Sequence, residues 1–156
     1  MENTGNTADF GDLSGTKWQL AASSSPTRGV FGGGEVVGGD RWDVIEYITI
    51  ASTGNVTDFG NLSATRYELD SVASQTRALF AAGRDSGGYS DTIEYITIAS
   101  TGNVTDFGNL SQTRKAAAGV SSSIRAVFGG FPTVDTLEFV TIATTGNSTD
   151  FGNLTT

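Results

Sequence analysis

The chain of 156 residues contains no cysteine and no histidine. Without them it lacks thiolate and imidazole groups, the usual ligands of structural zinc and the usual partners in nucleophilic catalysis. Basic residues are also few: 9 lysine and arginine residues stand against 17 acidic ones, for a net charge of −8. Such a chain has no electrostatic attraction for nucleic acid or an anionic membrane. We therefore predict no cofactor, no metal site, no nucleic-acid partner and no membrane partner.

Long hydrophobic runs are absent as well. No stretch approaches the roughly 18 apolar residues that a membrane helix needs. The N-terminal residues Met1–Thr4 are polar and acidic and lack the basic and apolar regions of a secretory signal. We therefore expect a soluble protein without a signal peptide. Its 21 glycines and its many serines and threonines suit short strands joined by tight turns.

One phrase of ten residues occurs four times. Its copies begin at Thr4, Thr53, Thr101 and Thr145, so the starts are 49, 48 and 44 residues apart. The middle two copies read TGNVTDFGNL, the last reads TGNSTDFGNL and the first reads TGNTADFGDL. A period of about 40 to 50 residues with strand-forming content is typical of stacked or radial repeat architectures.

Two further segments repeat between the copies of this phrase. The first covers residues 14–31, 63–80 and 111–128 without a gap, with a basic residue at its fourth position and an arginine three residues before a phenylalanine. The second covers residues 43–51, 91–99 and 135–143. All differences in length fall in the link between the two segments, which comprises residues 32–42, 81–90 and 129–134.

Each unit is predicted to hold four short antiparallel strands. The segment that begins at Asp43 alternates β-branched and aromatic residues as a strand does. The TGN phrase supplies a turn, and the residues after it form the returning strand. Arg28–Gly33 is a short apolar strand, and Trp18–Ser23 is a strand of small residues that fits a place with little room. The fold class is therefore all-β, and four-stranded sheets at this period are typical of β-propeller blades.

The chain also resembles the kelch repeat, in which an apolar strand ends in Gly-Gly and is followed by a strand bearing tyrosine and by an aromatic outer strand. The matching residues are Val30–Gly33, Glu46, Tyr47 and Phe59, and again Val127–Gly130, Phe139 and Phe151. Isoleucine follows Tyr47 where the family has aspartate, phenylalanine replaces the outer tryptophan, and Ala81-Ala82 replaces Gly-Gly. The tandem units are similar to kelch-like repeats in phage structural and tail-associated proteins. The resemblance covers nearly the whole chain and implies an architecture rather than an activity.

The repeats divide the single domain into an additional outer strand and three blades. The outer strand is residues 1–13, and the blades are residues 14–63, 64–111 and 112–156. Three blades are too few for a ring, since propellers have about four to eight. We therefore expect a homo-oligomer, with two copies that close a ring of six blades.

The copy at Thr4–Leu13 duplicates the outer strand that the last blade already has at Thr149–Thr155. Both copies cannot take the same place in one blade. Because Phe10 and Leu13 match the apolar pattern of the other copies, we expect the N-terminal copy to join a sheet.

Three motifs have a possible functional meaning but recur at fixed places. The Asp-Phe-Gly triplets resemble the magnesium motif of kinases, yet no catalytic lysine or HRD motif accompanies them. The glycosylation sequons occupy turns and strand ends, and Gly32–Gly34 is followed by neither a helix nor Lys-Ser/Thr. We interpret all three as structural. The sequons begin at Asn55, Asn61, Asn103, Asn109, Asn147 and Asn153.

The recurring carboxylates leave two interpretations open. They are Asp43, Asp91, Asp135, Glu46, Glu94 and Glu138. Such a set could bind calcium. Because an arginine also recurs in each unit, at Arg28, Arg77 and Arg125, an ion pair within each blade is the favoured interpretation.

Residues that break the repeat are free to serve a function. Most lie in the variable link, which is expected to open on the same face as the loops with Lys17, Arg66 and Arg114. Aromatic and charged side chains on one face suit a glycan or protein ligand, and the alternative is a loop tolerant of change. The ligand-binding candidates are Glu35, Arg41, Trp42, Arg84, Asp85, Tyr89 and Phe131, with Pro132 beside them.

These features predict a non-enzymatic, self-assembling β-propeller module of phage type, structural or ligand-binding, with a glycan as the leading ligand hypothesis. The expected location is a phage virion or the host cytoplasm. Two alternatives remain open. The chain could be a fragment or engineered excerpt of a longer array with no ligand of its own. It could also be a propeller enzyme, which without histidine and cysteine would depend on carboxylates alone.

Overall fold

The computed structural model describes residues 6–131, 133 and 135–155. The expectations stated for Met1–Thr4 and for Pro132 fall outside these residues. The described residues form fourteen strands and no helix, which confirms the all-β prediction. In this part of the chain, no helix is long and apolar enough to cross a membrane.

Twelve strands form three antiparallel sheets of four strands each. The first sheet contains, in spatial order, β2 (Ala21–Ser24), β3 (Arg28–Gly32), β5 (Val44–Thr49) and β6 (Thr57–Asn61). The second sheet contains β7 (Asp70–Ala73), β8 (Arg77–Ala81), β9 (Ser90–Thr97) and β10 (Thr105–Arg114). The third sheet contains β11 (Ala118–Ser121), β12 (Arg125–Gly129), β13 (Thr136–Thr141) and β14 (Thr149–Asn153). A short pair outside the predicted pattern joins β1 (Lys17–Trp18) to β4 (Glu35–Val36).

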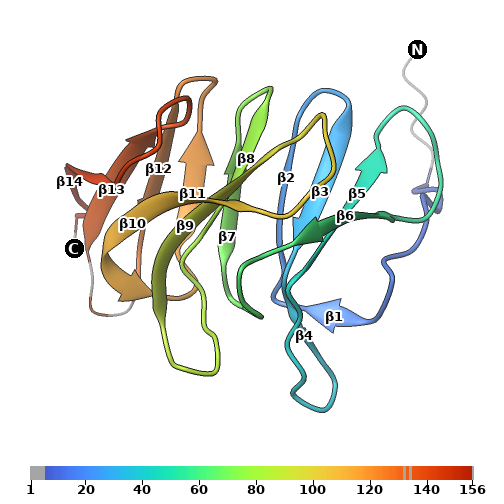
Figure 1. The fold of residues 1–156 in the computed structure, drawn as a ribbon, viewed down its shortest axis with the longest axis horizontal. Helices are drawn as coiled ribbons and strands as arrows, with labels where there is room; N and C mark the ends of the chain where they lie inside the picture. Colours follow the sequence, from blue (N-terminus) through green and yellow to red (C-terminus); the bar gives the residue numbers. More distant parts are fainter. Residues whose placement is uncertain (1–5, 132, 134, 156) are drawn as a thin grey trace.

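The three sheets follow one another along the molecule, and their first strands β2, β7 and β11 lie side by side (Figure 1). Ser23 and Ser71 share a hydroxyl–hydroxyl hydrogen bond of 2.7 Å, and the Ser121 hydroxyl donates to the Ala73 carbonyl at 2.8 Å. Gly119 of β11 lies so close to β7 that a Cβ there would meet Asp70 and Val72. Small residues occupy these strands because the three backbones converge.

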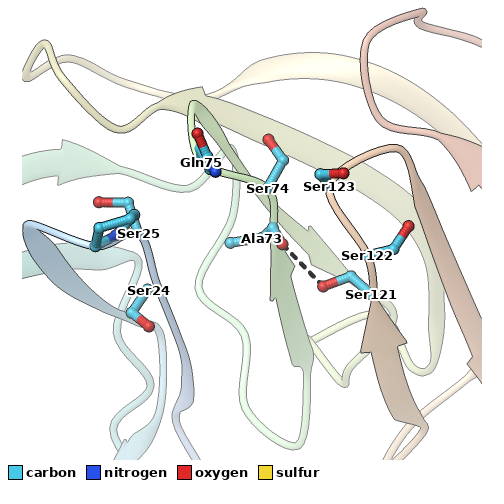
Figure 2. A pocket seen from close by; sticks show the side chains of 9 residues that line it. Ser24, Ser25, Ala73, Ser74, Gln75, Ser121, Ser122 and Ser123 are labelled. Atoms are coloured by element: carbon cyan, nitrogen blue, oxygen red, sulfur yellow. Dashed lines mark hydrogen bonds between the residues drawn. The ribbon is translucent and has the colours of Figure 1, made fainter.

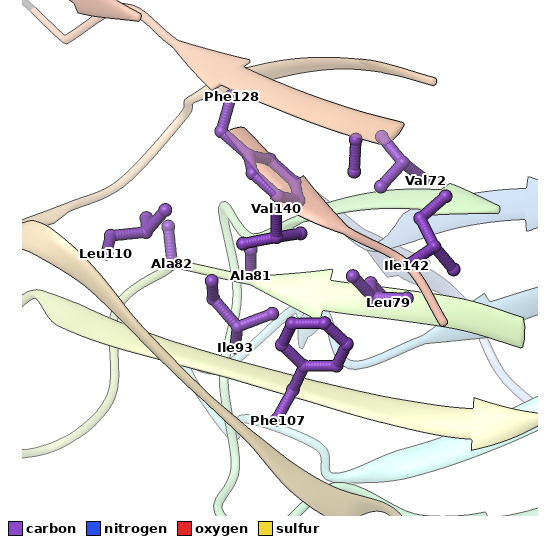
Figure 3. Close-up of a cluster of buried hydrophobic side chains, with 11 residues drawn as sticks. Val72, Leu79, Ala81, Ala82, Ile93, Phe107, Leu110, Phe128, Val140 and Ile142 are labelled. Carbon is purple, nitrogen blue, oxygen red and sulfur yellow. The ribbon is translucent and has the colours of Figure 1, made fainter. Parts of the chain in front are cut away.

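Apolar side chains fill the two spaces between the sheets. In β9, Ile93 belongs to the core shared with the third sheet, whereas Ile96 belongs to the core shared with the first sheet. The predicted alternation along this strand is therefore confirmed, with both faces buried. Figure 3 shows the core between the second and third sheets, in which Phe128 and Phe107 face each other across a group of aliphatic side chains.

The recurring aromatic residues of the strands are buried to different degrees. Phe80 and Phe128 are fully buried, but the equivalent Phe31 is only half-buried because no sheet precedes the first one in the described chain. Tyr47 and Tyr95 are half-buried and meet Phe59 and Phe107 edge to face, at 5.9 Å between ring centroids in both pairs. Phe139 is half-buried as well.

Each sheet contains one buried ion pair, as the favoured interpretation of the carboxylates predicted. The glutamates, however, do not pair with the expected arginines. Their partners are the basic residues at the fourth position of the first repeated segment: Lys17 with Glu46 at 2.7 Å, Arg66 with Glu94, and Arg114 with Glu138. These basic side chains are therefore buried inside the sheets and do not belong to a ligand-binding face.

The other three arginines stack on the rings of β5, β9 and β13 instead. Arg28 lies 4.4 Å from the Tyr47 ring, and Arg77 lies 4.5 Å from the Tyr95 ring. Arg28 also donates to the Ile98 carbonyl of the second sheet at 2.7 Å, and Arg77 repeats this contact with Ile142 at 3.0 Å. Arg28 and Arg77 therefore tie successive sheets together.

A second repeated contact joins successive sheets at their outer strands. The turn after β9 donates from Gly102 and Val104 to the carbonyls of Phe59 and Asn61 in β6, at 2.7 and 3.0 Å. Gly60 lies directly beneath this turn with φ +147°, and a Cβ there would collide with the Gly102 carbonyl. The glycine of the Asp-Phe-Gly triplet is therefore explained by close packing. The turn after β13 meets Phe107 and Asn109 of β10 in the same way.

The N-terminal segment, residues 6–13, makes this contact without belonging to a sheet. Gly54 and Val56 donate to the carbonyls of Phe10 and Asp12 at 2.7 and 3.0 Å. The segment thus lies where the outer strand of a preceding sheet would lie. No strand pairs with its other edge in the described chain, which differs from the expectation that it joins a sheet.

Candidate functional site

The two ends of the three sheets carry different chemistry. We call one end the link face, which consists of β1, β4 and residues 19, 33–43, 67–68, 82–89, 115–116 and 130–131. We call the other end the turn face, which consists of the β2–β3, β7–β8 and β11–β12 turns. The two faces lie at opposite ends of the strands (Figure 1). The predicted ligand-binding candidates all belong to the link face.

Four of the candidates meet in one row across the link face. The Arg41 guanidinium lies 4.8 Å from the Tyr67 ring, and Arg84 lies 6.0 Å from the rings of both Tyr67 and Tyr89. Tyr89 packs edge to face against Phe131, with ring centroids 5.2 Å apart. The row therefore interleaves two cations with aromatic rings and ends in a pair of rings, and Tyr89 remains 45% exposed.

Glu35 and Trp42 form a separate group at the first sheet. Trp42 is half-buried, with the Lys17 ammonium 4.7 Å from its ring, and the Trp42 backbone N–H donates to the Gly34 carbonyl at 2.9 Å. Glu35 lies in β4 opposite Trp18 of β1. Trp42 thus covers a buried ion pair and supports the fold, whereas Trp18 is exposed.

Asp85 has a local structural role. Its carboxylate accepts the N–H groups of Gly87 and Gly88 at 2.6 and 3.0 Å, as aspartate does in turns of this kind. Because both contacts shape its own loop, Asp85 is a turn residue rather than a free ligand group.

A chain of backbone hydrogen bonds joins the three sheets at the inner rim of the link face. Glu68 N–H donates to the Gln19 carbonyl at 2.9 Å, and Ala116 N–H donates to the Glu68 carbonyl at 2.7 Å. All three residues have left-handed backbones, with φ of 53°, 53° and 49°. Non-glycine residues adopt this conformation only when their surroundings enforce it. The rim is therefore formed by a backbone conformation that repeats in each unit, whereas the side chains along it differ from unit to unit.

Two side chains at the rim, Glu68 and Lys115, carry opposite charges. Glu68 accepts a hydrogen bond from the Gln19 amide at 3.1 Å and pairs with Lys115 at 2.7 Å. The hydrogen bond to Glu68 raises the pKa of Lys115, so this ammonium stays charged at neutral pH. The rim consequently offers a neutralised pair rather than a net charge.

Tyr67, Glu68 and Lys115 also belong to the link face, although the variable links did not predict them. Their signal was present, because the two positions after the repeated basic residue read Trp18-Gln19, Tyr67-Glu68 and Lys115-Ala116. These positions break the repeat as strongly as the links do. They follow buried basic residues, however, and only the left-handed turn brings their side chains to the rim.

The turn face holds a pocket of about 460 Å³ between the three hairpin turns (Figure 2). Serine side chains line most of it: Ser24, Ser25, Ser74, Ser121, Ser122 and Ser123, with Pro26, Ala73 and Gln75. Ser25, Ser74 and Ser122 accept backbone N–H groups within their own turns. The pocket is polar but uncharged, so it offers hydroxyl groups and no acid or base.

One unit-specific acid lies near the converging strands. Asp70 begins β7 where the other sheets have alanine, and burial raises the pKa of its carboxyl. In the described part of the chain, no group of three or more acidic side chains could hold a metal ion. No protein-family model and no curated protein matches the chain.

Proposed function

We propose that the protein is a non-enzymatic assembly module whose three sheets are kelch-like propeller blades, and that a second copy completes the ring. The phage structural role rests on the sequence resemblance alone. The self-association rests on one observation: residues that are buried wherever two sheets meet within the described chain are only half-buried on the first sheet and exposed on the last sheet.

The third sheet exposes one half of such an interface. Phe151 and Leu154 are 54% and 45% exposed, whereas the equivalent Phe59 and Leu62 are 2% and 3% exposed. Val120 of β11 is also exposed, although Val72, at the same position in β7, is buried against the third sheet. Apolar side chains that pack in the interior at one unit therefore lie in water at the next.

The other half lies on the first sheet, where it is only half-buried. A cavity of about 300 Å³ separates it from the N-terminal segment, lined by Phe31, Ile48, Val56 and residues 10–13. The equivalent Phe80 and Ile96 are buried against Val30 and Ile45 of the first sheet. In a second copy, the residues equivalent to Val30 and Ile45 are Val127 and Leu137, which we propose fill this cavity.

The polar contacts between sheets support the same pairing. Arg125 occupies the position of Arg28 and Arg77 but has no carbonyl acceptor in another sheet of the described chain. Ile50, equivalent to the acceptors Ile98 and Ile142, is exposed on the first sheet. The two faces are thus complementary to each other and not to themselves. Such head-to-tail contacts form closed rings when the rotation allows it.

Analytical ultracentrifugation over a concentration series tests this proposal. We expect the chain to associate, with two copies as the main species. The double variant F151S/L154S should remain folded and lose the association, because both side chains lie on the exposed face. Val37→Ser is the matched control, since Val37 is 92% exposed on the link face. A chain that stays monomeric at all concentrations would falsify the proposal.

A second candidate function is ligand binding at the link face, and the exposed Tyr89, which packs edge to face against the half-buried Phe131, favours it. A ring edge of this kind suits the apolar face of a sugar, and Arg84 beside it suits a hydroxyl or carboxylate. A glycan array should show binding that Tyr89→Ala abolishes and Val37→Ala preserves. Absence of binding to every glycan, with the assembly intact, would leave the link face without this role.

A further inference from the structure

The N-terminal segment occupies the place that assembly requires for another strand. We call residues 53–56 the docking turn, because it corresponds to the turns that hold β6 and β10 between sheets. In the described chain the docking turn holds Phe10 and Asp12 by two backbone hydrogen bonds, and Asn55 Oδ1 accepts the Asp12 N–H at 3.0 Å. If a second copy docks as proposed, its β14 needs the same three bonds.

The matching groups of β14 are unoccupied in the described chain. Gly11 lies so close to the docking turn that a Cβ would collide with the Gly54 carbonyl, and Gly60 and Gly108 lie equally close to their turns. Gly152 of β14 is the exception, with nothing of the described chain within 4 Å of the position of a Cβ. The described chain therefore contains four copies of the outer strand, namely residues 6–13, β6, β10 and β14. It contains three turns that can hold such a copy.

The two competitors are held unequally. β14 pairs with β13 from Thr136↔Asn153 to Phe139↔Thr149, and Ser148 donates a further hydrogen bond to Glu138. The N-terminal segment has no strand on its other edge in the described chain. Its release costs its contacts with the docking turn and the Ser14 N–H bond to Glu46, whereas the release of β14 breaks a strand ladder.

The N-terminal copy is also the weaker strand by sequence. It departs from the recurring TDFGN at two positions, with Ala8 in place of threonine and Asp12 in place of asparagine. Threonine favours extended strands, and alanine and aspartate do not.

We infer that the N-terminal segment is a replaceable placeholder, which covers the docking turn in the free chain and is displaced by β14 of a second copy. This inference rests on the proposed self-association. The partner is a second copy of this chain, and the interface is formed by Gly54, Asn55 and Val56 on one side and Phe151–Asn153 on the other. Covering these groups in the free chain lowers the apparent affinity, because only the uncovered fraction is competent to bind.

Paired substitutions distinguish the placeholder from the opposite arrangement. In that arrangement the N-terminal segment of one copy replaces β14 beside β13 of the other copy. A8T/D12N strengthens the placeholder and should raise the dissociation constant by about fivefold. T149A/N153D weakens the incoming strand and should raise it by a similar factor. If the N-terminal segment replaced β14, both variants would lower the dissociation constant instead, and that result would overturn the inference.

Deletion of residues 1–13 provides a third measurement. The truncated chain should associate about tenfold more tightly or better, since no competitor remains. Weaker or unchanged association of a folded truncated chain would contradict the inference, while association itself would still support the ring. If neither the full chain nor any variant associates, both the placeholder and the proposed self-association are rejected. If the truncated chain does not fold, the two double variants still show whether the dissociation constant rises, as the placeholder requires, or falls.

Discussion

Arg66 and Glu94 form an ion pair inside the second sheet, and neither side chain is more than 3% exposed. Burial lowers the pKa of Arg66, while the charges of Glu94 and Asp85 oppose that effect. Arg66 donates a further hydrogen bond to the Ala82 carbonyl at 3.0 Å. The guanidinium thus links the start of the second unit to β9 and to the residue that follows β8.

Removal of the acid from this pair should be costly. Glu94→Gln leaves the Arg66 charge buried without compensation, and we expect a loss of about 3–5 kcal/mol in the free energy of unfolding. Urea denaturation measures this loss. The double variant R66M/E94L serves as control and should be more stable than Glu94→Gln, because it removes both charges. Equal stability of Glu94→Gln and the unmodified chain would refute the expectation.

The recurring glycine of the outer strands allows a matched comparison. Gly108→Ala and Gly152→Ala impose similar backbone strain, at φ of +144° and +139°. Only Gly108 lies against a docked turn within the chain, so its replacement should lower the unfolding midpoint of the monomer much more. Thermal denaturation in dilute solution measures the difference. An equal loss at both sites would show that strain alone explains these glycines.

Arg77 and Arg125 form a second matched pair. Both stack on an aromatic ring, at 4.5 and 4.3 Å, but only Arg77 donates to a carbonyl of another sheet within the described chain. Arg77→Met should destabilise the monomer by about 1.5–3 kcal/mol, the contribution of a hydrogen bond from a charged donor. Arg125→Met should cost much less. Denaturant titration below the concentration of association gives both values.

Asp70 should make part of the stability depend on pH. Burial raises its pKa above the ordinary 3.8, so the folded protein holds this proton more tightly than the unfolded chain does. Its contribution to stability is full below pH 3.8, falls as the pH rises through the raised pKa, and stays low above it. Asp70→Asn should therefore be more stable than the unmodified chain at pH 7, and the advantage should vanish below pH 3.8. Unfolding free energies measured across this range provide the test.

The repeat made most of the fold predictable from the sequence. Four strands per unit, the alternation in β9 and the fully buried Phe80 and Phe128 follow from local patterns that three units confirm for one another. The ion-pair partner was not predictable in this way. Arg28 and Lys17 are both basic and both repeat, and only the path of the chain brings Lys17 to Glu46.

The link face was predictable in part. The variable links pointed to Arg41, Arg84, Tyr89 and Phe131, which do meet in one row. Tyr67 was missed because it follows a buried arginine, and the left-handed backbone at Glu68 has no strong sequence signal. Asp85 and Trp42 have the composition of ligand residues, yet they stabilise a turn and cover an ion pair.

The serial arrangement of the sheets has a consequence for their local opening. In the described residues each sheet packs against its neighbours in sequence, so among them only the second sheet is covered on both faces. In such a linear array, stability is approximately a sum over units and their shared interfaces, and the terminal units open first. The amide protons of β8 and β9 should therefore exchange with solvent most slowly, and those of β14 and the N-terminal segment most rapidly. Association would remove this gradient, because a closed ring has no terminal unit.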